Sequence, residues 1–164
     1  MYLWNIQALK KELIADAVTE SQVFVYFMAV LVLETLLFNV AMLTPGTEDK
    51  SVWDYIDFVG SVVFTLGGTL VAYRMNGGSA GRAFLSRFFP LMWVLTVRFL
   101  VALLTLILIA IIFMILFSVS LFGAETGSED FAVLTMADAM LSWAWFLVFY
   151  YRLAVHMRDV ARAA

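Results

Sequence analysis

The chain has 164 residues, of which 64% are hydrophobic and only 14% charged, and its formal net charge is -3. A soluble domain has about 45–50% apolar and about 25% charged residues, so too few polar side chains are present here to coat a water-facing surface. Cysteine is absent, which excludes disulfides and thiolate metal ligands. The composition therefore predicts an all-α, polytopic membrane protein.

Residues 1–18 predict an amphipathic helix. Apolar residues recur every three or four positions, and charged residues occupy the other side. The apolar side consists of Leu3, Ile6, Leu9, Leu13 and Ala17. Two interpretations are open: a helix lying in the headgroup plane of the membrane, or a helix packed beneath the protein's own bundle. The first is favoured, so residues 1–18 are assigned as an interfacial surface helix.

Four transmembrane helices are predicted in residues 19–164. A bilayer core about 30 Å thick needs about 20 apolar residues in a helix, and the run from Leu100 to Phe122 carries no charge at all. Two pairs with the spacing of a capping box mark helix starts, Thr19 with Gln22 and Ser51 with Asp54. The third span is predicted to begin after Pro90, because the basic residues before Pro90 suit the membrane interface. The expected spans are 20–43, 52–75, 91–122 and 131–151, followed by a cytoplasmic helical tail at 152–164.

The basic residues predict how these spans are oriented. With the N-terminus on the inner side, that side receives nearly every Lys and Arg, and the outer side keeps only Lys50. The inner residues are Lys10, Lys11, Arg74, Arg82, Arg87, Arg152, Arg158 and Arg162, joined by Arg98 if it lies at the boundary. An excess of Lys and Arg in cytoplasmic loops is the positive-inside pattern. We therefore expect both termini to be cytoplasmic, in a cell membrane of the bacterial inner-membrane type.

Two carboxylates, Glu34 and Asp138, interrupt otherwise apolar spans. At 1.5 Å per residue, Glu34 is expected roughly 20 Å from an inner boundary at Ser21. Asp138 is expected roughly 21 Å from an inner boundary at Arg152, so the two acids would share a level. A charge at mid-bilayer costs at least about 2.5–3.5 kcal/mol, and both side chains are therefore expected to face the bundle interior, a partner or water.

Arg98 and Asn39 complete the candidate intramembrane polar site. Arg98 lies at the inner boundary if the third span begins at Phe99, which is the preferred position. It needs a carboxylate such as Glu34 if that span begins at Pro90. Asn39 would extend a polar path along the second half of its helix. In the competing interpretation, which is slightly preferred, each acid only makes hydrogen bonds between helices or near the headgroups.

Small residues in span 52–75 predict a face for close helix packing, because small side chains let backbones approach each other in lipid. They are Gly60, Ser61, Thr65, Gly67, Gly68, Thr69 and Ala72. Aromatic residues next to arginines are expected to anchor the inner ends of two spans, with the ring among the headgroups and the guanidinium at phosphate. These anchors are Tyr73 with Arg74 and Tyr151 with Arg152.

Together these patterns favour a small homo-oligomeric membrane protein with a structural or accessory role. The expected partners are the lipid bilayer, further copies of the chain and a protein that contacts the cytoplasmic N-terminal helix or tail, whereas nucleic acid is not expected. The alternative is an ion or proton channel or transporter that uses Glu34 and Asp138. The sequence holds no nucleotide, metal or hydrolase motif, so no enzyme activity, metal or cofactor is expected.

Overall fold

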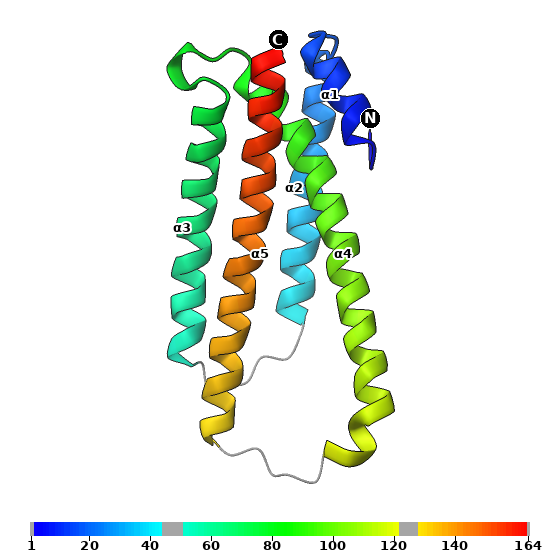
Figure 1. Cartoon of the computed structure of the whole chain (residues 1–164), viewed down its shortest axis with the longest axis vertical. Coiled ribbons are helices and arrows are strands. Elements are labelled where there is room, and N and C mark those ends of the chain that lie inside the picture. The colour runs from blue at the N-terminus through cyan, green and yellow to red at the C-terminus, as the bar shows by residue number, and fades with distance from the viewer. Residues whose placement is uncertain (1, 44–50, 122–127, 164) are drawn as a thin grey trace.

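The computed structural model describes residues 2–43, 51–121 and 128–163, and its regular elements in these ranges are all helices. They are α1 (Ile6–Ile14), α2 (Glu20–Leu43), α3 (Val52–Met75), the short 3-10 helix η1 (Gly78–Ala80), α4 (Phe84–Leu121) and α5 (Ser128–Ala163). The four long helices run side by side, and α1 lies at the end of the bundle that holds both termini (Figure 1). The predicted all-α class is confirmed.

Three of the long helices are long and apolar enough to cross a membrane. The stretches that meet this description are Glu20–Leu37, Val52–Met75 and Phe84–Phe113. Their side chains are mostly exposed rather than buried within the chain, which is the arrangement expected where lipid covers them. The chain is therefore compatible with a membrane-embedded protein.

The starts of α2 and α3 are fixed by local hydrogen bonds. Thr19 N–H donates to Oε1 of Gln22 at 3.0 Å, and Gln22 N–H donates to Oγ1 of Thr19 at 3.4 Å. Ser51 N–H donates to Oδ2 of Asp54 at 2.6 Å in a second capping box. Each box satisfies amide groups that have no partner inside the helix. Both predicted helix starts are confirmed.

Helix α4 is longer than predicted, because it begins at Phe84 and continues through Pro90. A proline inside a helix cannot donate to the carbonyl four residues earlier, here that of Ser86, and this typically costs about 3 kcal/mol. The Pro90 ring is fully buried, and Leu91 and Val94 beside it belong to the core. Tertiary packing thus holds the segment helical where local preference favoured a boundary.

The buried core lies at the end of the bundle that holds α1. Its members come from all five α-helices and include Leu9 of α1, Tyr26 of α2, Ala72 of α3, Leu91 of α4 and Leu153 of α5. In α1 the buried residues lie on one face, which contacts α4 and α5. The structure therefore places the apolar face of α1 against protein, in line with the second interpretation of residues 1–18.

The closest helix contact is between α3 and α5, which run in the same direction (Figure 1). A Cβ atom on Gly60 would lie 2.4 Å from Nε1 of Trp143, and one on Gly68 would lie 2.2 Å from the Tyr150 ring. Residues of α3 therefore lie level with residues 82 or 83 positions later in α5. This register fixes how deep each polar side chain lies.

Candidate functional site

Glu34 lines a cavity of about 410 Å³ in the middle of the bundle, to which all four long helices contribute. The other polar side chains at this cavity are Thr65 of α3, Thr96 of α4 and Tyr150 of α5. The remaining lining is apolar or aromatic, as at Phe99. Glu34 thus borders a space between the helices, although the residue itself is exposed rather than buried.

Ring contacts set the depth of Glu34. Phe27 of α2 packs on Phe89 of α4 with ring centroids 4.8 Å apart, and Glu34 follows Phe27 by seven residues. Because α2 and α4 run in the same direction (Figure 1), Glu34 lies level with Thr96, which follows Phe89 by the same seven residues. Phe99, three residues further along α4, packs on α5 through Trp145 and Phe149, with centroids 5.0 and 5.2 Å apart.

The structure does not bring Asp138 to this cavity. Asp138 is exposed on α5, twelve residues before Tyr150, which is about 18 Å along the helix. By the α3–α5 register, Arg74 lies level with His156 and Met157. If Arg74 marks the inner boundary, Asp138 lies about 27 Å away, near the far side of a core about 30 Å thick. Phe99 lies between Trp145 and Phe149 of α5, so Thr96 and Glu34 lie near the level of Tyr150. Glu34 is then only about 9 Å from the same boundary, and the two acids do not share a level.

Arg98 contacts the N-terminal segment instead of a carboxylate. Its Nε donates to the carbonyl oxygen of Trp4 at 3.0 Å, its Nη2 donates to the same oxygen, and its guanidinium lies 5.3 Å from the centroid of the Trp4 ring. Arg98 lies only two residues beyond the level of Glu34, yet no ion pair joins them among the described residues. The side chain thus reaches from α4 to the segment that precedes α1.

The Asn39 side chain makes its hydrogen bond within its own helix. Its Nδ2 donates to the carbonyl of Thr35 at 2.8 Å, and the Thr35 hydroxyl donates to the carbonyl of Leu31 at 2.8 Å. Neither residue lines the Glu34 cavity. The polar path expected from Glu34 through Asn39 is therefore absent from the described cavity lining.

The predicted packing residues of α3 divide among several environments. Gly60 and Gly68 face Trp143 and Tyr150, and Ala72 is completely buried. Thr65 lines the central cavity, and the Ser61 hydroxyl donates to the carbonyl of Phe58 at 2.8 Å. Thr69 is half-buried, whereas a Cβ on Gly67 would meet nothing within 4 Å.

The predicted inner anchors are all exposed, but they do not lie at one depth. Tyr73 packs edge-on against Phe84 with centroids 5.4 Å apart, next to Arg74 at the end of α3. By the α3–α5 register, Arg152 and its neighbour Tyr151 lie more than one helical turn deeper than Arg74, about 7 Å along the helix.

A charged cluster at the end of the bundle that holds both termini was missed by reasoning from the sequence. The Nζ of Lys10 in α1 lies 2.7 Å from Oδ2 of Asp159 in α5, and the ammonium holds the pKa of Asp159 below its usual value. His156 lies nearby, and burial together with the charge of Lys10 lowers its pKa to about 4. The sequence did contain a signal for this cluster. Spacings of four and then three residues place Arg152, His156 and Asp159 on one helix face.

No protein-family model, curated protein or solved structure matches this chain. What the protein does is therefore inferred from its geometry and chemistry.

Proposed function

We propose that residues 19–164 form a four-span membrane domain with both termini cytoplasmic, and that the protein has an accessory role rather than a catalytic one. Support for the fourth span comes from the α3–α5 contact. Trp143 and Tyr150 lie level with Gly60 and Gly68, in the middle of a helix that is itself apolar enough to cross a membrane. A segment of α5 at that depth is surrounded by the same lipid.

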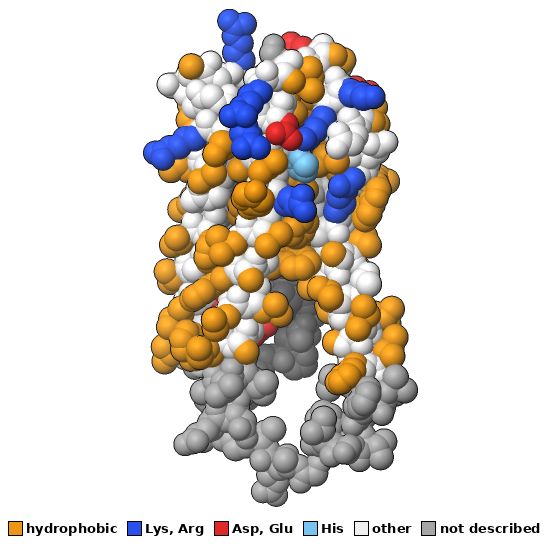
Figure 2. Space-filling view, viewed as in Figure 1, with side chains coloured by type: hydrophobic (Ala, Val, Ile, Leu, Met, Phe, Trp, Pro, Cys, Tyr) orange, Lys and Arg blue, Asp and Glu red, His pale blue; other side chains and the backbone are white. Residues whose placement is uncertain are grey.

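The distribution of charge supports the orientation. Blue Lys and Arg side chains gather at the end with the termini, and orange hydrophobic side chains cover the described surface below them (Figure 2). Cytoplasmic flanks carry an excess of Lys and Arg, and anionic lipids on the same side attract them. This basic end is the single observation that best supports the role proposed here, contact with the inner membrane surface or with an acidic protein partner.

Self-association is part of the proposal. The exposed face of α5 carries the acid Asp138, which a second copy could cover. Mass measurement in mild detergent is expected to give a species larger than the monomer, and a monomer at every concentration would remove this part of the proposal.

The topology can be tested by cysteine labelling, since the chain has no cysteine of its own. Cysteines at Thr47 and Thr126 are expected to react with an impermeant reagent added to intact cells, whereas cysteines at Ser79 and Ala163 should react only after lysis. Labelling of Ser79 from outside would overturn the four-span orientation.

A second candidate is a proton or cation site at Glu34, favoured by its place on a cavity between the helices with Thr65 and Thr96. Asp138 is not part of this candidate, because it lies about 18 Å along α5 from Tyr150, which lies near the level of Glu34. Flux of protons or alkali cations into liposomes that contain the protein would favour this candidate over a purely accessory role.

A further inference from the structure

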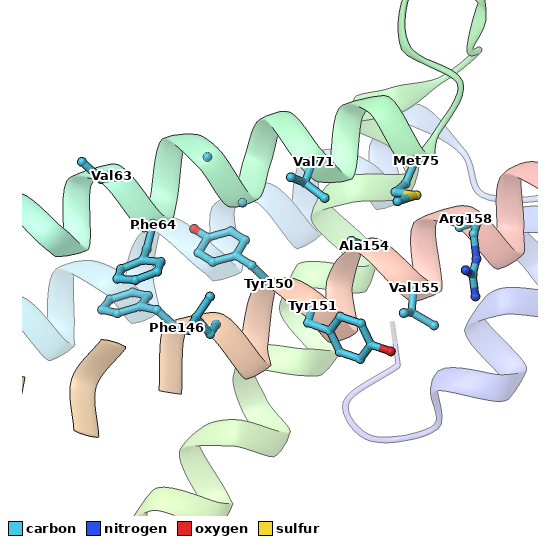
Figure 3. Close-up of a pocket in the computed structure, with 13 residues that line it drawn as sticks. Val63, Phe64, Val71, Met75, Phe146, Tyr150, Tyr151, Ala154, Val155 and Arg158 are labelled. Atoms are coloured by element: carbon cyan, nitrogen blue, oxygen red, sulfur yellow. The ribbon is translucent and has the colours of Figure 1, made fainter. Parts of the chain in front are cut away.

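A groove of about 450 Å³ runs along the outside of the bundle between α3 and α5. Figure 3 shows Val63, Val71 and Met75 following each other along α3, opposite Tyr151 and Val155 on α5. Val63, Val71 and Tyr151 are exposed, so the groove opens toward the surroundings of the bundle.

Two adjacent glycines shape the middle of this groove. Gly68 meets the Tyr150 ring, which closes the groove toward the bundle interior. A Cβ on Gly67, by contrast, would meet nothing within 4 Å, so the missing side chain leaves open volume along the wall. The groove extends from Val63 to Met75, a rise of about 18 Å, which is close to one leaflet of a hydrocarbon core about 30 Å thick.

Arg158 lies at the inner end of the groove (Figure 3). Its Nε is buried and has no hydrogen-bond partner within the part of the chain that the structure describes. Its Nη2 lies 3.8 Å from Oδ1 of Asp159, which is beyond hydrogen-bond distance, and the other carboxylate oxygen, Oδ2, binds Lys10 at 2.7 Å. The guanidinium therefore retains donors for an anionic group at the level where apolar lining ends.

We propose that this groove binds an anionic phospholipid, with one acyl chain along α3 and α5 and the phosphate at Arg158. The site is apolar over one leaflet and cationic at its inner end, which matches the order of chain and headgroup in the cytoplasmic leaflet. Guanidinium and phosphate form charge-assisted, often bidentate hydrogen bonds. The inference rests on the membrane placement proposed above.

The test counts lipids on the full chain in mild detergent by native mass spectrometry, with phosphatidylglycerol and phosphatidylcholine of identical acyl chains as the probes. One phosphatidylglycerol is expected to be retained per chain, about tenfold more tightly than phosphatidylcholine. Arg158→Gln should lose about tenfold for phosphatidylglycerol and little for phosphatidylcholine, and Arg158→Lys should recover part of the loss. Arg82→Gln is the matched control, since Arg82 is an exposed arginine at the same end that does not line the groove.

The acyl-chain part is tested by filling the groove. Gly67→Leu should weaken retention of both lipids about tenfold, and Val71→Phe serves if the first variant does not fold. Equal phosphatidylglycerol retention in wild type and Arg158→Gln would overturn the headgroup assignment. If Gly67→Leu abolished a dimer and left lipid retention unchanged, the groove would be a protein interface and the proposal would be wrong. Cysteine labelling reports topology separately, so a failure there is distinguishable from a failure here.

Discussion

The ammonium of Lys10 and the carboxylate of Asp159 lie 2.7 Å apart although 149 residues separate them in the chain. Lys10 is almost completely buried, whereas the Asp159 side chain is 42% exposed. The pair joins α1 to the end of α5, and Arg98 of α4 holds the carbonyl of Trp4 just before α1. Tyr2 N–H also donates to the Tyr26 hydroxyl of α2 at 2.7 Å, so the N-terminal segment is bonded to the bundle at three places.

Asp159→Asn is expected to loosen the docking of α1, because it leaves a buried ammonium with a neutral acceptor. The cost should be about 1 kcal/mol, toward the lower end for a charged hydrogen bond, since Asp159 is partly exposed. A cysteine at the fully buried Leu9 reports this change, and its labelling rate should rise about fivefold. Asp16→Asn, an exposed acid with positive φ, is the control with the same change of charge. An unchanged rate in Asp159→Asn would mean that the Lys10–Asp159 pair does not hold α1 in place.

Acidification should destabilise the protein through His156. Its pKa falls to about 4 in the folded chain, because of burial and the neighbouring cations Lys10, Arg152 and Arg98. The nearby carboxylate of Asp159 acts in the opposite direction and raises the pKa. The unfolded chain takes up a proton near pH 6.5, so stability is lost as the pH falls from about 6.5 to about 4. The full pKa difference would correspond to about 3 kcal/mol, and less is expected because His156 is only half-buried.

The measurement is the thermal unfolding midpoint in detergent at several pH values between 7 and 4. His156→Gln should flatten the decline in that range, because glutamine does not ionise. The Asp159 contribution lies lower, since its pKa is depressed and its stabilisation is lost only below pH about 4. Parallel curves for wild type and His156→Gln would show that another group governs the acid response.

Two neighbouring glycines should respond oppositely to alanine. In Gly68→Ala the new Cβ would lie 2.2–2.7 Å from atoms of Tyr150, so the ring must move, and overpacking of this kind typically costs about 1–3 kcal/mol. Gly67→Ala meets open space and should be neutral or stabilising by up to about 1 kcal/mol. Thermal unfolding compares the two, and adding Tyr150→Ala, which removes the ring atoms at 2.2 and 2.4 Å, should relieve part of the loss in Gly68→Ala. A similar loss in both single variants would contradict the α3–α5 register.

Variants of Glu34 separate its two roles. If Glu34 only makes hydrogen bonds, Glu34→Gln keeps a donor and an acceptor and should leave assembly unchanged, whereas Glu34→Leu should weaken it by about 0.6 kcal/mol. If Glu34 carries protons or cations, Glu34→Gln should abolish liposome flux while assembly persists, because the amide cannot ionise. Asp138→Asn is the control, and it should leave flux intact. Equal flux and assembly in all variants would show that Glu34 serves neither role.

The sequence by itself determined the helix class and two of the helix starts. The capping boxes at Thr19 and Ser51 act between residues three positions apart, and hydropathy over about 20 residues is a property of one segment. The basic residues at one end could likewise be assigned from their order along the chain. These features need no knowledge of how helices pack.

Only the tertiary structure decided the depth of the polar groups and the place of α1. The expected common level of Glu34 and Asp138 assumed boundaries for each helix separately, whereas their actual offset depends on contacts such as Gly68 with Tyr150. The continuation of α4 through Pro90 depends on burial of the proline ring. The docking of α1 depends on Asp159, which lies 149 positions after Lys10 in the chain. Such contacts join surfaces of different helices, and the periodicity within one helix does not encode which residue of the next lies opposite.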